Sequence, residues 1–93
     1  MRDIQTLRAE LDQIDAEIVA LLERRLSVSR EVAEYKRERQ LPVLDASREE
    51  QVLEDRAARL DEENLREYVR EVFRDIMAMS RAEQTSRMEE NHV

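Results

Sequence analysis

One unbroken amphipathic stretch, residues 4–36, most constrains what this chain can fold into. Hydrophobic residues recur there at alternating spacings of three and four, which is typical of a helix that buries one narrow seam. The seam positions are Ile4, Leu7, Leu11, Ile14, Ile18, Leu21, Arg25, Val28, Val32 and Tyr35. Among them only Arg25 is charged. Because a guanidinium cannot shed its charge, Arg25 must meet anionic partners or lie in a polar pocket.

The helix that this pattern predicts is too long for one copy of the chain to cover. No Pro or Gly interrupts residues 3–39, so the helix spans roughly 55 Å at ~1.5 Å per residue. A compact domain of 93 residues has a radius of gyration of only ~12 Å. We therefore expect a homodimer in which a second copy covers part of the seam.

The composition favours one all-α domain. The sequence has no Gly and one Pro, and 42% of its residues are charged, which suits helices joined by short connections. The net charge of −7 argues against general nucleic-acid binding. No hydrophobic run approaches the ~20 residues of a membrane span.

The absence of Cys excludes a disulfide framework and a thiolate metal site. It also agrees with a reducing compartment. The N-terminal residues lead directly into an amphipathic helix and do not resemble a signal peptide. We therefore expect a cytoplasmic protein.

Pro42 predicts the end of the first helix, because it disfavours helical geometry at Leu41. A second helix is predicted over about residues 47–60. Asp45 or Ser47 can serve as its N-cap, and Ser47 and Glu50 have the spacing of a capping box.

A third helix is predicted after the acidic connector at residues 61–64. Its hydrophobic stripe consists of Leu65, Tyr68, Val69, Val72, Phe73, Ile76 and Met77. The same face then becomes polar at Ser80 and Gln84, and the pattern is lost from Thr85 to Val93. We therefore predict an ordered domain over residues 1–85 and a frayed tail over 86–93. His92 in that tail has no companions that would make it a ligand or a catalyst.

Arg25, Ser29, Val32 and Lys36 form one stripe, at i, i+4, i+7 and i+11. The two cations lie ~16 Å apart along the axis, by the helical rise. Their long side chains can lean together over a floor of small residues and enclose a compact dianion. Alternatively, Arg25 pairs with a Glu from another helix and Lys36 is solvated.

Other polar residues allow a similar choice between a site and a surface. Arg8 lies ~25 Å before Arg25 and about 100° round the helix, so it can reach such a pocket only from a partner chain. Arg48 and Glu49 either border the buried side of the second helix or are solvated first-turn residues. Ser80 and Gln84 either hydrogen-bond in a site or mark a fraying helix end. No metal-ligand spacing, phosphate loop or nucleophile triad is visible.

In combination, these residues resemble the all-helical chorismate mutases over residues 4–85. The matching segments are Leu7-Arg8-x-x-Leu11-x-x-Ile14-Asp15, Leu21-Leu22-x-x-Arg25, Val32-x-x-x-Lys36, Pro42-Val43-x-Asp45-x-x-Arg48-Glu49 and Phe73-x-x-Ile76-x-x-x-Ser80-x-x-x-Gln84. The resemblance implies an intertwined six-helix homodimer of three-helix chains. It also implies the rearrangement of chorismate to prephenate, in phenylalanine and tyrosine biosynthesis, without cofactor, metal or covalent intermediate.

The resemblance further implies a site built from both chains. One chain would supply Arg25, Lys36, Asp45, Arg48, Glu49, Ser80 and Gln84, and its partner would supply Arg8. The catalytic residues among them would be Arg25, Lys36, Glu49 and Gln84.

Two other functions compete with the mutase. An isochorismate-pyruvate lyase shares the fold and the cationic pocket, but Glu49 at the hydroxyl-facing position favours the mutase. A helical dimerisation module without catalytic function explains the heptads. It does not explain Arg25 in the seam or the polar pair Ser80 and Gln84.

Overall fold

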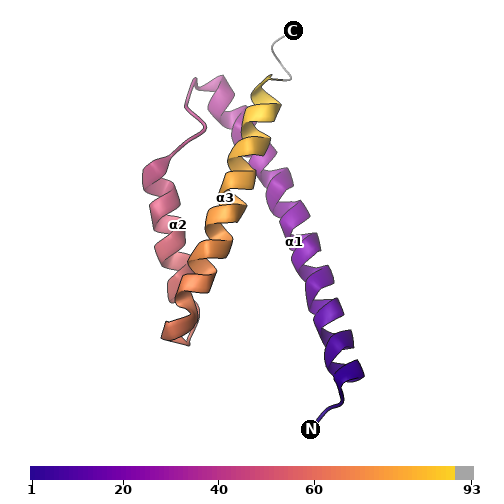
Figure 1. The fold of residues 1–93 in the computed structure, drawn as a ribbon. Helices are drawn as coiled ribbons and strands as arrows, with labels where there is room; N and C mark the ends of the chain where they lie inside the picture. Colours follow the sequence, from indigo (N-terminus) through magenta and orange to yellow (C-terminus); the bar gives the residue numbers. More distant parts are fainter. Residues whose placement is uncertain (90–93) are drawn as a thin grey trace.

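The computed structural model describes residues 1–89, and these residues form helices and no strands. The elements are α1 (Ile4–Glu38), α2 (Ala46–Ala58), a short 3-10 helix η1 (Glu63–Leu65) and α3 (Arg66–Glu89), as Figure 1 shows. The predicted all-α, three-helix chain is thereby confirmed. Within the described residues, no helix has both the length and the hydrophobicity needed to span a lipid bilayer.

The ends of α1 are fixed by local hydrogen bonds. At its start, the Asp3 carboxylate accepts from the Thr6 amide at 2.8 Å. At its end, the Leu41 amide donates to the Lys36 carbonyl at 2.8 Å and the Gln40 amide donates to the Arg37 carbonyl at 3.2 Å, the pattern of a Schellman motif. Gln40 therefore takes a positive φ of 56°, which costs a non-glycine residue ~1–2 kcal/mol.

The second helix starts one residue earlier than predicted and uses Asp45 as its N-cap. The Asp45 carboxylate accepts from the Arg48 amide at 3.0 Å. The capping box predicted from Ser47 and Glu50 is therefore wrong, because Asp45 already caps the helix and Ser47 lies inside its first turn. The helix also ends at Ala58, earlier than predicted.

The third helix lies between the other two (Figure 1) and packs against both of them. The small hydrophobic core contains Ala33 from α1, Val52 and Ala57 from α2, and Met77 from α3. The radius of gyration is 16.8 Å and the long axis measures 58 Å. This radius of gyration exceeds the ~12 Å that is expected for a compact domain of this size.

The chain stays helical from Thr85 to Glu89, where we expected the pattern to fray. Contacts with α1 explain this difference, because Arg87 Nε lies 3.0 Å from Glu34 Oε1. One turn earlier, Arg30 Nε of α1 lies 2.5 Å from Glu83 Oε1. The rest of the expected tail, residues 90–93 with His92, lies outside the described residues.

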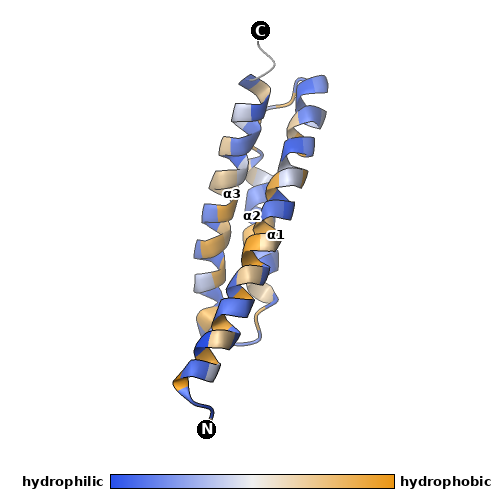
Figure 2. Ribbon diagram, turned by 90° about the vertical axis from the view of Figure 1, so that its right-hand side faces the viewer, coloured by the Kyte–Doolittle hydropathy of each residue, from blue (hydrophilic) through white to orange (hydrophobic). Residues whose placement is uncertain are grey.

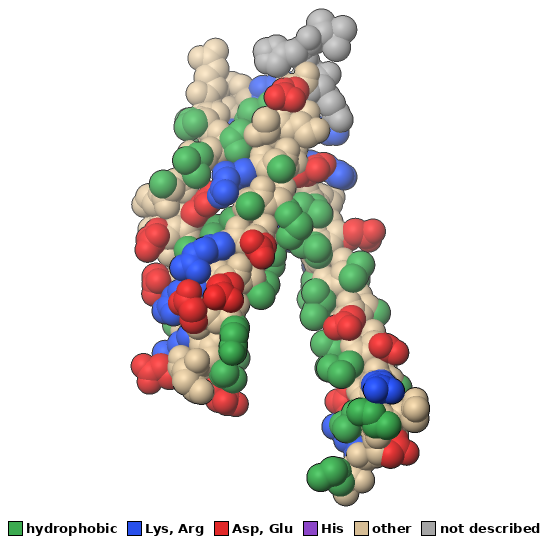
Figure 3. Space-filling model, viewed as in Figure 1, with side chains coloured by type: hydrophobic (Ala, Val, Ile, Leu, Met, Phe, Trp, Pro, Cys, Tyr) green, Lys and Arg blue, Asp and Glu red, His purple; other side chains and the backbone are tan. Residues whose placement is uncertain are grey.

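The hydrophobic seam of α1 is largely uncovered in the single chain. Leu11, Ile14, Ile18 and Leu21 are each 43–57% exposed. Figure 2 shows hydrophobic positions along the part of α1 that projects beyond α2 and α3, and Figure 3 shows hydrophobic side chains on the inner side of this arm. The accessible surface is 7533 Å², whereas a compact monomer of 11.1 kDa exposes ~5,700 Å².

Candidate active site

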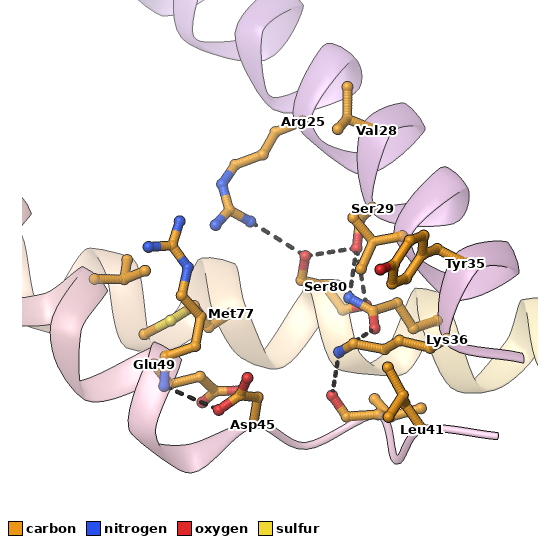
Figure 4. Close-up of a pocket in the computed structure, with 15 residues that line it drawn as sticks. Arg25, Val28, Ser29, Tyr35, Lys36, Leu41, Asp45, Glu49, Met77 and Ser80 are labelled. Atoms are coloured by element: carbon orange, nitrogen blue, oxygen red, sulfur yellow. Dashed lines mark hydrogen bonds between the residues drawn. The ribbon is translucent and has the colours of Figure 1, made fainter. Parts of the chain in front are cut away.

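A pocket of about 520 Å³ lies where α1, the α1–α2 connection, the first turns of α2 and the C-terminal half of α3 meet (Figure 4). This volume suits a small-molecule ligand. Of the eight predicted site residues, seven line the pocket: Arg25, Lys36, Asp45, Arg48, Glu49, Ser80 and Gln84. Hydrophobic walls are supplied by Val28, Val32, Tyr35, Leu41, Val43, Val52 and Met77.

Arg8 is the predicted site residue that this pocket lacks. It is exposed on the projecting half of α1. Arg8 is therefore out of reach of the pocket of its own chain, as the residue spacing predicts.

A chain of hydrogen bonds joins the two pocket cations of α1 through buried polar side chains. Arg25 Nη1 donates to Ser80 Oγ at 3.1 Å, and Ser80 Oγ lies 2.8 Å from Ser29 Oγ. Gln84 Nε2 donates to Ser29 Oγ at 3.0 Å, and Lys36 Nζ donates to Gln84 Oε1 at 3.1 Å. Ser29, Ser80 and Gln84 are each at most 8% exposed. The polar face of α3 is therefore a buried contact with α1 and not a fraying end.

The network leaves specific donors unused. Lys36 Nζ also donates to the Val43 carbonyl at 2.6 Å, so two of its three N–H groups are engaged. An ammonium only donates, so the oxygen of the Gln84 amide faces Lys36 and its nitrogen faces Ser29. One of the two N–H groups of that nitrogen is engaged by Ser29. Lys36 and Gln84 thus each retain one N–H for a ligand oxygen.

The pocket is electropositive although the protein is acidic overall. Among residues 1–89, Arg25, Lys36 and Arg48 form no ion pair with a carboxylate. The alternative in which Arg25 pairs with a Glu is therefore wrong for the single chain. Burial lowers the pKa of the Arg25 guanidinium, and the positive charges of Arg56 and Arg48 lower it further. These effects disfavour its charged form, and a bound anion would offset them.

The two pocket carboxylates are already engaged by the protein. Asp45 Oδ1 caps α2 by accepting from the Arg48 amide, and the Asp45 backbone carbonyl accepts from the Glu49 amide at 3.0 Å. Glu49 Oε1 accepts a hydrogen bond from Arg81 Nη1 of α3. Neither carboxylate neutralises a cation of the pocket.

Sequence reasoning missed three contributors to this site. The sequence analysis assigns Ser29 only to the floor of the pocket, although its position four residues after Arg25 indicates that it faces the same pocket. The Val43 carbonyl that holds Lys36 comes from a loop whose path no local pattern reveals. Arg81 had no signal, because its contact with Glu49 joins residues 32 positions apart.

The arrangement is suited to binding a small anion and donating hydrogen bonds to one of its oxygen atoms. Three cations supply the charge, and Lys36 and Gln84 present their remaining N–H groups. Within residues 1–89, no three His, Asp or Glu side chains come together as a metal site would require.

The chain matches a known protein family over most of its length. The sequence model of the family described as chorismate mutase type II matches residues 7–85. All eight predicted site residues fall within this segment. Comparisons with curated proteins and with solved structures give no match.

The buried network predicts a specific stability loss for Ser29→Ala. This change leaves Gln84 Nε2 without its buried acceptor and removes one of the two side-chain partners of the Ser80 hydroxyl, which costs ~1–3 kcal/mol. Ser27→Ala is the matched control, because Ser27 is exposed on the same helix and the gain in helix propensity is the same. Urea denaturation at one protein concentration compares the two variants. Equal free energies of unfolding would contradict the role assigned to Ser29.

Proposed function

The chain belongs to the chorismate mutase type II family, and on that premise we propose that it converts chorismate to prephenate, for phenylalanine and tyrosine biosynthesis. The single observation that carries this proposal is the cationic pocket, where Arg25, Lys36 and Arg48 have no carboxylate partner within the described residues. An acidic protein that keeps three cations unpaired around one cavity is suited to a dianion. Chorismate is a dianion with two carboxylates.

Carboxylate binding is assigned to the arginines. Arg25 and the partner's Arg8 bind the two carboxylates of chorismate, and Arg48 supports them, because guanidinium groups form paired hydrogen bonds with carboxylates. The Ser80 hydroxyl, which accepts from Arg25 at 3.1 Å, holds the carboxylate of the ring. These contacts keep the substrate in a compact diaxial conformer, so much of the entropic cost of the rearrangement is met on binding.

Transition-state stabilisation is assigned to Lys36 and Gln84. As the C–O bond breaks, negative charge develops on the ether oxygen. The N–H groups that remain unused on Lys36 and Gln84 donate to this oxygen. Their effect is large because the network has already oriented them in a site from which water is displaced.

Binding of the ring hydroxyl of chorismate is assigned to Glu49 and the Asp45 backbone, which would accept its hydrogen bond. Both line the same part of the pocket, at the start of α2. The rearrangement is intramolecular, so no side chain has to act as a nucleophile or transfer a proton. No cofactor is required by this mechanism.

We also propose that the active form is an intertwined homodimer. The exposed seam of α1 and the ~1,800 Å² of accessible surface beyond that of a compact monomer support this state. A crossing copy of α1 would cover the seam and bring its Arg8 to the pocket.

The proposal predicts that the purified chain consumes chorismate and forms prephenate. Ultraviolet absorbance follows the loss of chorismate, and acid conversion of the product to phenylpyruvate identifies prephenate. Pyruvate release from isochorismate, with no prephenate from chorismate, would assign the chain to the lyases instead. If neither substrate reacts and Arg25→Leu raises stability, the chain is a dimerisation module.

Removing either donor to the ether oxygen should lower kcat. Lys36→Ala and Gln84→Ala each remove ~3 kcal/mol of transition-state stabilisation, about a hundredfold in rate. Thr85→Ala, an exposed change one residue after Gln84, is the control and should keep wild-type kcat. Circular dichroism checks that all three variants keep their helices. Wild-type kcat in Lys36→Ala or Gln84→Ala would refute the assignment.

The shared site predicts complementation between inactive variants. Arg8→Ala and Lys36→Ala homodimers each lack one essential residue in both sites. After subunit exchange, a mixed dimer has one site with both residues, so an equal mixture should regain about a quarter of wild-type activity. Mass spectrometry of differently labelled chains verifies the exchange. Proven exchange without recovered activity would contradict a site built from two chains.

A further inference from the structure

We propose that Arg81 is a positioning residue, which holds Glu49 in place to accept the ring hydroxyl and thereby contributes to substrate specificity. This inference rests on the proposed function. Neither the family pattern nor the spacing in the sequence assigns any role to Arg81. Its hydrogen bond to Glu49 across the α2–α3 interface supports this role.

The contact engages one oxygen of Glu49 and leaves the other available. Arg81 Nη1 donates to Glu49 Oε1, and no described residue donates to Oε2. The Glu49 side chain is 23% exposed and lines the pocket, whereas Arg81 is 37% exposed and is not among the lining residues. Arg81 therefore holds the carboxylate from outside the cavity and keeps one acceptor atom for a ligand.

Arg81 also keeps Glu49 away from the pocket cations. Arg25, Lys36 and Arg48 line the same cavity as this carboxylate. Without Arg81, these cations are the groups of opposite charge that share the cavity with Glu49. Such a pair would neutralise part of the charge that binds a dianion and would occupy part of its space. Arg81 supplies a competing charge at the edge of the site, so the pocket stays open.

A purely structural role for the Arg81–Glu49 pair is the alternative. The α2–α3 interface already has a hydrophobic contact through Val52, Ala57 and Met77. It also has a second ion pair, between Arg70 and Glu54 at 3.3 Å, whose residues do not line the pocket. Partly exposed ion pairs contribute little to stability. Arg70→Gln is therefore a matched control, since it removes an α2–α3 ion pair away from the site.

The test compares Arg81→Gln, Arg81→Lys and Arg70→Gln on chorismate and on an analogue that lacks the ring hydroxyl. For Arg81→Gln we expect kcat/KM on chorismate to fall by up to roughly 100-fold, because a site group misplaced by ~1 Å can cost that much in rate. Arg81→Lys should recover part of the loss, because it keeps the charge. Arg70→Gln should match wild type. On the analogue, Arg81→Gln should lose clearly less activity than on chorismate, because only the loss of free positive charge remains when Glu49 has no hydroxyl to bind.

A double variant tests whether Arg81 acts through Glu49. If it does, Arg81→Gln combined with Glu49→Gln should be no slower than Glu49→Gln alone, because coupled residues are not additive. The role of Arg81 would be overturned by additive losses in the double variant, by an equal loss on the analogue, or by unchanged kinetics of Arg81→Gln. In each of these cases, turnover of chorismate by the wild type would still support the proposed function. No wild-type turnover of chorismate would overturn the proposed function and this inference together.

Discussion

The buried contact between α1 and α3 is polar, and the rest of the site depends on it. Where two long helices usually interlock hydrophobic side chains, this chain places Ser29 against Ser80 and Gln84. A buried polar network is stable only when its members are satisfied, and in the described residues no buried side-chain nitrogen or oxygen lacks a partner. The network therefore fixes how α3 lies on α1. The same hydrogen bonds orient Gln84 and Lys36. The contacts that pack α3 on α1 therefore also position the side chains of the site.

Charge is distributed so that the pocket keeps its cations. Arginines on the outer faces find carboxylates, as in Arg30 with Glu83 and Arg74 with Glu67. Inside the pocket, Asp45 is engaged as a helix cap and Glu49 is held by Arg81. The protein's excess of acidic residues thus stays away from Arg25. Burial and neighbouring cations disfavour the charged form of Arg25 and lower its pKa, and a bound anion would offset both effects.

The sequence predicts those features that follow from helical periodicity. The three-helix chain and the shared stripe of Arg25, Ser29 and Lys36 follow from residue spacing, which a helix converts directly into position. The sequence does not decide the N-cap of α2, because Asp45 and Ser47 both have a suitable side chain. The positive φ of Gln40 gave no signal, since Gly usually occupies such a position. The Arg81 contact depends on how α2 and α3 approach each other, and no local pattern encodes that approach.

Arg25 also explains why a site in this fold would be shared between two chains. The residues of α1 that are buried within the single chain are Ser29 and Ala33, whereas Leu21, Val28 and Val32 of the seam remain at least 39% exposed. Successive residues on a helix are ~100° apart, so the buried face with Ser29 lies next to the seam with Val28. Arg25 belongs to both faces, because it lies four residues before Ser29 and three residues before Val28. Arg25 donates to Ser80 within the chain, while the adjacent seam residues Leu21 and Val28 are exposed to solvent. In the homodimer that we propose, the pocket around Arg25 must therefore open at the boundary between the two copies. A residue on the projecting arm, such as Arg8, can enter from the partner without altering the packing within either chain.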